Sequence, residues 1–292
     1  MNGKQLLLAA IRNQPTPRPA WVPFVGCHGG NLIGRPADEY LKSAELLVDG
    51  LKKAHELYRP DGLPVVFDLQ VEAEILGCDL QWAADVPPAV TSHPLSSMSL
   101  DDLPPYDLSR GRMPLILDAL DRLHADLGDQ VAFYGLVCGP FTLALHLMGN
   151  DIFLEMFDDP GQVKAVIDHA ADVAIKTAGA YLDHKAAVIA VVDPMTSQIS
   201  PEHFEEFVTP AVNKVFDAVR ARGGMSSMFV CGDVTRNLGM MCRTHADNVS
   251  VDEQIPMDKL AELCRANGKS FGGNIKLTAV LLLGDERDAK LE

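Results

Sequence analysis

Polar and titratable side chains follow each apolar, β-branched run of this sequence. They include thiols, an imidazole and several carboxylates, the groups that bind metal ions or carry protons in enzymes. If the runs are parallel strands, their carboxyl ends lie along the same edge of the sheet. These side chains would then line one shared site at that edge. The candidate catalytic residues are Cys231, Asp68 and Glu253, and the candidate substrate-binding residues are His28, Gln70, Asp193, Asp252 and Asn274.

Cys231 is the sharpest of these candidates. It ends an expected strand beside a Gly-Asp turn. Residues two apart on a strand face the same side, so Phe229 and Cys231 are expected to point together toward the mouth. A pair of metal ligands would use that geometry, but phenylalanine cannot ligate a metal. The alternative is that Cys231 is a small buried thiol of the core.

Two further carboxylates, Asp68 and Asp193, each follow a different expected strand. Asp68, in the string FDLQVEAEILG, follows an otherwise apolar run and is a stronger functional candidate than Glu72 or Glu74. Those two glutamates are expected to be solvated or salt-bridged. Asp193 either hydrogen-bonds a ligand or caps the turn before Pro194.

The adjacent Asp252 and Glu253 end another strand. One of them could complete a metal site or act as an acid or base, because like charges held close together raise one pKa. The alternative is a favourable interaction with the dipole of the helix that follows. Cys242 and His245 have C-x-x-H spacing, which is a weaker zinc candidate because it lies toward the far end of its unit.

Strand and helix patterns alternate along the chain, and near-continuous apolar runs such as AAVIAVV are typical of strands buried on both faces. This alternation predicts a (β/α)₈ barrel, because the turn GCHGGN does not match the GxGxxG of a doubly wound nucleotide-binding fold. Seven strands can be counted, so residues 1–292 are expected to form a single barrel domain that lacks the last βα unit. The expected strands are Trp21–Val25, Val65–Phe67, Val131–Val137, Val188–Val192, Ser227–Val230, Asn248–Val251 and Ser270–Gly273, and the expected helices are Ser43–Leu57, Met113–Leu127, Gln162–His184, Phe204–Arg220 and Met257–Arg265.

Composition excludes several classes of protein. The net charge of −15 disfavours nucleic acid as a partner, and no apolar run reaches the roughly 18 to 20 residues of a membrane span. The N-terminus lacks the basic start and the cleavage site of a signal peptide, and the six cysteines form no CxxC pair. These features predict a cytoplasmic protein with reduced thiols and no membrane partner.

Several strings, in order, resemble the uroporphyrinogen-decarboxylase superfamily over nearly the whole chain. They are RPAWVPFVG, PVVFDLQVEAEILG, YGLVCGPFTLA, VVDPMTSQISPEHFEEFVTP, FVCGDVTRNLGMM, SVDE and GGNI. The resemblance implies a (β/α)₈ barrel. It is closest to the corrinoid-dependent methyltransferase branch, whose D-x-x-V-E-A-E-x-L-G type string is present. The arginine-rich segment of true decarboxylases is absent, and VGCHGGNLIGRPADEY carries only Arg35.

The same resemblance implies a zinc site with an H-x-C motif on the fifth strand. Cys231 matches the first cysteine of that motif, Phe229 stands at the histidine position, and the second cysteine is expected beyond Glu292. Zinc would lower the pKa of a bound acceptor thiol. With one ligand position substituted, zinc is only a conditional expectation.

The leading hypothesis is a methyltransferase that moves a methyl group between a corrinoid (methylcobamide) protein and a small acceptor such as a thiol. A pterin held by Asp252 and Asn274 is the substitute acceptor if zinc is absent. Two alternatives are a decarboxylase of the uroporphyrinogen type and a non-catalytic corrinoid- or tetrapyrrole-binding barrel. A homodimer is compatible with these hypotheses.

Overall fold

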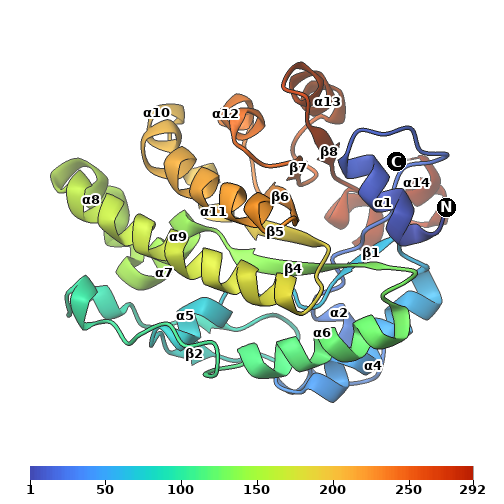
Figure 1. The fold of residues 1–292 in the computed structure, drawn as a ribbon, viewed down its shortest axis with the longest axis horizontal. Helices are drawn as coiled ribbons and strands as arrows, with labels where there is room; N and C mark the ends of the chain where they lie inside the picture. Colours follow the sequence, from blue (N-terminus) through green and yellow to red (C-terminus); the bar gives the residue numbers. More distant parts are fainter. Residues whose placement is uncertain (292) are drawn as a thin grey trace.

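Six parallel strands form the main sheet of this computed structural model, which describes residues 1–291 (Figure 1). Their order is β1-β4-β5-β6-β7-β8, so each strand of the sheet pairs with the next one along the chain, and the sheet curls into half of a barrel. A two-stranded antiparallel ribbon, β2 with β3, stands apart. The strands are β1 (Gly62–Pro64), β2 (Leu80–Gln81), β3 (Ala89–Val90), β4 (Ala132–Cys138), β5 (Val188–Val192), β6 (Met225–Val230), β7 (Asn248–Val251) and β8 (Ser270–Gly272).

Helices fan around the outside of the curled sheet (Figure 1). The α-helices are α1 (Gly3–Ile11), α2 (His28–Asn31), α3 (Ala37–Tyr40), α4 (Ala44–Tyr58), α5 (Val71–Ile75), α6 (Met113–Leu127), α7 (Pro140–Met148), α8 (Ile152–Asp158), α9 (Pro160–Asp183), α10 (Pro201–His203), α11 (Thr209–Ala221), α12 (Leu238–Arg243), α13 (Met257–Ala266) and α14 (Glu286–Leu291). Short 3-10 segments are η1 (Pro94–Ser96), η2 (Leu100–Asp102), η3 (Gly149–Asp151) and η4 (Pro194–Gln198), and π-helical segments are η5 (Phe204–Val208) and η6 (Leu277–Leu282).

Local sequence explains several helix boundaries. The side chain of Ser43 accepts a hydrogen bond from Leu46 N at the start of α4, and the side chain of Ser200 does the same for His203 N in α10. Both are N-caps, which satisfy amide groups that the helix itself leaves free. Helix α4 ends where Arg59 adopts a left-handed conformation with φ of 46°.

The concave face of the sheet changes character from one end to the other. On β4 and β5 it is apolar, with Leu136, Val188 and Ala190 packed against Leu7 and Ile11 of α1. On β6 to β8 it is a ladder of polar side chains. Ser227 Oγ donates to Asn248 Oδ1 (2.8 Å), Asn248 Nδ2 donates to Ser270 Oγ (3.0 Å), and Ser250 Oγ also donates to Asn248 Oδ1 (2.8 Å).

Most expected elements lie where they were predicted, but the first two strands do not. The segment Trp21–Val25 lies next to the start of β1, where Asp61 N donates to Trp21 O (2.8 Å), yet it is not a strand. Pro23 has no N–H to donate, which prevents a regular ladder. The second prediction, Val65–Phe67, was placed three residues late, because β1 pairs with β4 from Gly62 opposite Ala132.

Six strands rather than seven therefore belong to the main sheet of the described residues. Within residues 1–291, no helix is both long enough and apolar enough to cross a membrane.

Candidate active site

Cys231 lies at the carboxyl end of β6 with its side chain partly buried. The next residue, Gly232, has φ of 93°, a left-handed conformation that favours glycine. Its amide donates to the carboxylate of Asp252, which follows β7. Burial, together with the negative charge of Asp252, raises the pKa of the Cys231 thiol to about 11. The thiol is therefore protonated at neutral pH in the protein alone.

Hydrogen bonds connect the segments that follow β7 and β8 at the same edge of the sheet. Asn274 Nδ2 donates to the carbonyls of Asp252 (2.6 Å) and Ile255 (2.9 Å), and the carboxylate of Glu253 accepts from Leu277 N. We call Cys231, Asp252, Glu253 and Asn274 the β6–β8 group. Its members come from three successive strand ends, as expected for the mouth of a parallel barrel.

Asp68 belongs to a second, buried group on the other side of the fold. Its carboxylate pairs with Arg112 Nη1 (2.5 Å) and accepts from Gln70 N (2.8 Å). Arg112 also donates from Nε to Glu74 (2.8 Å), and its guanidinium lies 4.8 Å from the ring centre of Trp82. We call Asp68, Glu74 and Arg112 the Asp68 group.

Arg112 is the residue that sequence reasoning missed. It occupies the N-cap position of α6, where a positive charge opposes the helix dipole. That mismatch is the signal that could have found it, because a cation placed there needs buried anions as partners. The expectation for Glu74 is confirmed, since it is salt-bridged.

Two other buried carboxylates hold the turn that follows β4. Asp193 accepts from Phe141 N (3.3 Å), Thr142 N (2.8 Å) and Thr142 Oγ1 (2.6 Å), which anchors the start of α7. Glu72 accepts from Cys138 N (3.2 Å), so the expectation that it is solvated or salt-bridged is wrong. Burial raises the pKa of Asp193 to about 6 and that of Glu72 to about 7. The geometry gives Asp193 a positioning role at this turn.

The side chains of His28 and Phe229 both pack against other aromatic rings. The exposed His28 lies with Nε2 2.7 Å from Tyr58 Oη, at the end of α4, and the two rings stack. Phe229 faces the barrel interior, where its ring meets Phe24 edge-on at 5.4 Å between centroids. Phe24 also contacts Phe67 and Tyr134, so Phe229 is part of an aromatic cluster.

The residues present do not fit a zinc ion. Zinc in proteins takes four ligands in tetrahedral geometry, at least three of them from side chains. The side chain of Phe229 packs in the aromatic cluster and supplies no ligand atom. The carboxylates of Asp252 and Glu253 already accept hydrogen bonds from backbone amides. Over residues 1–291, no three His, Cys, Asp or Glu side chains are arranged to hold a metal.

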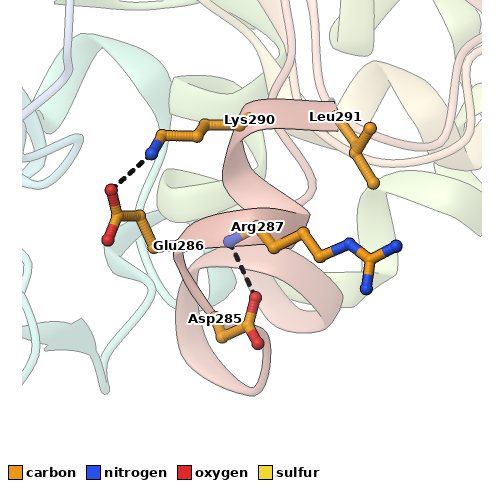
Figure 2. A pocket seen from close by; sticks show the side chains of 5 residues that line it. All are labelled: Asp285, Glu286, Arg287, Lys290 and Leu291. Carbon is orange, nitrogen blue, oxygen red and sulfur yellow. Dashed lines mark hydrogen bonds and ion pairs between the residues drawn. The ribbon is translucent and has the colours of Figure 1, made fainter.

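Two surface hollows are lined by residues outside these groups. One, of about 640 Å³, lies between α8 and α10 and is bordered by Phe157, Ile199 and His203. The other, of about 520 Å³, lies along α14, where Lys290 pairs with Glu286 and Arg287 N donates to Asp285 (Figure 2). Its side chains come from Asp285 and from the short helix α14.

Comparison with known proteins gives consistent relatives over the whole chain. A methylcobamide:CoM methyltransferase of Methanosarcina acetivorans is 28% identical over 98% of this chain and 86% of its own length. One from Methanosarcina mazei is 30% identical with the same coverage. A solved structure of a methyltransferase from Methanosarcina mazei superposes with a TM-score of 0.91 at 26% identity, covering 100% of this chain and 88% of the other.

A family model described as uroporphyrinogen decarboxylase (URO-D) matches residues 2–292. The chain therefore belongs to the uroporphyrinogen decarboxylase (URO-D) family.

Proposed function

We propose that this protein transfers a methyl group between a corrinoid (methylcobamide) protein and a small thiol acceptor. The observation that carries the proposal is the β6–β8 group, in which the half-buried Cys231 lies beside Asp252 at the carboxyl edge of the sheet. It occurs in a chain similar over nearly its full length to proteins named methylcobamide:CoM methyltransferases.

The chemistry requires the acceptor sulfur to attack the methyl carbon with its own electron pair. The carbon–cobalt bond breaks with its pair left on the metal of the substrate, and the thiol proton must go to a base. Asp252 and Glu253 supply carboxylates for that proton, and the Cys231 thiol lines the acceptor position. Asn274 holds the backbone of Asp252, and Asp68 with Gln70 is the proposed opposite wall.

Several broader assignments accompany this proposal. The curled sheet is part of a (β/α)₈ scaffold, residues 1–292 act as one barrel domain, and the protein works in the cytoplasm. Its partners are a corrinoid protein and a small-molecule acceptor, and a homodimer is retained as an assembly to test. The parallel strand order and the outer ring of helices support the scaffold assignment.

The decarboxylase alternative has less support from the geometry. A porphyrinogen carries many carboxylates, which call for accessible arginines. Arg112, the arginine that contacts Asp68, is buried and already paired with two carboxylates. Incubation with uroporphyrinogen is therefore expected to yield no decarboxylated product.

The proposal is tested by anaerobic incubation of the purified protein with methylcobalamin and coenzyme M. Loss of the methylcobalamin absorbance and appearance of the methyl thioether by mass spectrometry are the expected results. The variant Cys231→Ser should be slower, whereas Cys78→Ser, which changes a buried thiol that donates to the carbonyl of His146, should match the wild type. Absence of thioether with wild-type protein, or equal rates for all three proteins, would contradict the proposal.

A further inference from the structure

Two buried cysteines outside the proposed active site lie in sulfur–sulfur contact. Cys242 is near the end of α12 and Cys264 is near the end of α13, and their Sγ atoms are 3.6 Å apart. Both side chains are fully buried where the two helices pack together. A disulfide needs the sulfurs about 1.5 Å closer, a movement within reach of side-chain rotation.

The surroundings make the two thiols unequal. The hydrogen bond between the two thiols lowers the pKa of Cys242, and the positive charges of Lys269 and Arg243 act in the same direction. The same hydrogen bond raises the pKa of Cys264. Lys269 is held beside the pair by its own bond from Nζ to the carbonyl of Ala246 (2.6 Å). Cys242 is therefore the better nucleophile of the two.

We propose that Cys242 and Cys264 are a redox modification site, in which a hydroperoxide converts the dithiol to a disulfide that joins α12 to α13. The Cys242 thiolate attacks one peroxide oxygen, the O–O bond breaks, and Cys242 becomes a sulfenic acid as hydroxide leaves. The Cys264 sulfur then attacks the sulfenic sulfur, the S–O bond breaks, and water leaves. Two thiols are oxidised and one peroxide is reduced.

Access of peroxide follows from local opening. Helix α12 has only six residues and ends at Arg243. Short elements at the edge of a fold open at lower cost than the core sheet, so reaction is expected over minutes to hours rather than seconds. This inference does not depend on the proposed methyl transfer.

The chain between the two cysteines carries part of the candidate active site. It contains β7, Asp252 and Glu253, so the disulfide would close a covalent ring that includes two of the four residues of the β6–β8 group. Oxidation is therefore expected to slow amide hydrogen exchange in residues 244–256, while reduction restores the original rate.

The experiment treats the native full-length protein with hydrogen peroxide, blocks the remaining thiols by alkylation and digests with trypsin. The expected product links Asn237–Arg243 to Leu260–Arg265, and the count of free thiols falls from six to four. Peroxide also oxidises Met240 and Met241 in the first peptide, so the link is identified by its loss on reduction with dithiothreitol.

Two controls separate the pair from general oxidation. Cys264→Ser and Cys264→Ala remove the resolving thiol and should give no linked peptide, and either one that folds is sufficient. Cys78→Ser removes a buried thiol elsewhere and should leave the linked peptide unchanged. Uniform oxidation of all six cysteines, or an unlinked sulfinic acid at Cys242 in the wild type, would overturn the proposal.

Discussion

The two groups of carboxylates at the strand ends are built in opposite ways. In the Asp68 group, the buried carboxylate of Asp68 and the partly buried carboxylate of Glu74 are neutralised by the guanidinium of Arg112, which is itself 4% exposed. In the β6–β8 group, carboxylates are only partly buried and are held by backbone amides and by Asn274. Ion pairing neutralises the carboxylates of the first group. The carboxylates of the second group are bonded to neutral donors, so they keep a negative charge that a substrate could contact. The contrast predicts that Asp252 acts on the substrate and that Asp68 supports the mouth of the barrel.

The largest effect is expected from Arg112→Leu, which leaves the carboxylates of Asp68 and Glu74 without their partner. Breaking a buried ion pair from one side costs about 3 to 5 kcal/mol of unfolding free energy. Urea denaturation measures it. The matched control is Lys214→Met, which removes an exposed cation from Asp168 and Asp172 and should cost less than about 1 kcal/mol. Similar losses for both variants would remove the distinction between closed and open groups.

The next effect is a pH dependence that belongs to Glu72. Its pKa in the folded protein is about 7, against an ordinary value of 4.5, so between these pH values the folded protein binds a proton that the unfolded chain has released. The unfolding free energy therefore falls as pH rises through this window. Glu72→Gln keeps an oxygen for Cys138 N and lacks the titration.

The difference in unfolding free energy between Glu72→Gln and wild type should grow in favour of the variant by about 2.5 kcal/mol between pH 5 and pH 8. Urea midpoints at both pH values test it. Asp193, whose pKa is also raised, is present in both proteins, so its contribution cancels. A difference that stays constant with pH would show that the raised pKa of Glu72 is not present in the folded protein or lies outside this window.

In the open group, Asp252→Asn should reduce methyl transfer with little effect on folding. The amide oxygen can still accept from Gly232 N, but it cannot take a proton. Loss of a general base lowers kcat/KM by roughly a hundredfold, about 2.7 kcal/mol. The neighbouring exposed Asp233→Asn is the control and should retain activity. Equal activity of both variants would contradict the role of Asp252 as the base.

The smallest change in stability is expected from Phe229→His. It loses edge-on contact with Phe24, worth about 1 kcal/mol, and introduces an imidazole two residues before Cys231. The imidazole, the Cys231 thiolate and one carboxylate of Asp252 or Glu253 would then make three ligands, so zinc retained after dialysis, measured by atomic spectroscopy, should rise above the wild-type level. Adding Cys231→Ser to this variant should abolish the increase. Unchanged zinc in Phe229→His would mean that the site needs more than one restored ligand.

Periodicity located the interior of the fold well. The runs Val188–Val192 and Asn248–Val251 coincide with β5 and β7, and Met113–Leu127 coincides with α6, because continuous apolar or amphipathic patterns specify these buried elements. The segment at Trp21–Val25 has the composition of a strand but lacks a donor at Pro23. Local pattern therefore gives an element's type and leaves its hydrogen bonding to tertiary context.

The candidate site was predictable only in part, for the same reason. The strand-end rule brings Cys231, Asp252 and Asn274 together, because each follows its own strand directly. It could not show that Asp68 is paired with Arg112, 44 residues away along the chain, or that His28 pairs with Tyr58. Those partners are chosen by helix packing, which a single sequence does not reveal.

The polar ladder on the concave face of β6, β7 and β8 has a consequence for assembly. Asn248 satisfies its carbonyl and amide ends on opposite neighbours, Ser227 and Ser270. A shift of one residue in the pairing of these strands would turn the side-chain amide of Asn248 toward the apolar side that the helices cover. Its N–H groups would then have no acceptor, at a cost of roughly 1 to 3 kcal/mol for each unpaired group. The inward side chains of β4 and β5 are apolar, so their register does not depend on side-chain hydrogen bonds of this kind. The ladder therefore favours the native register of β6, β7 and β8 over registers shifted by one residue.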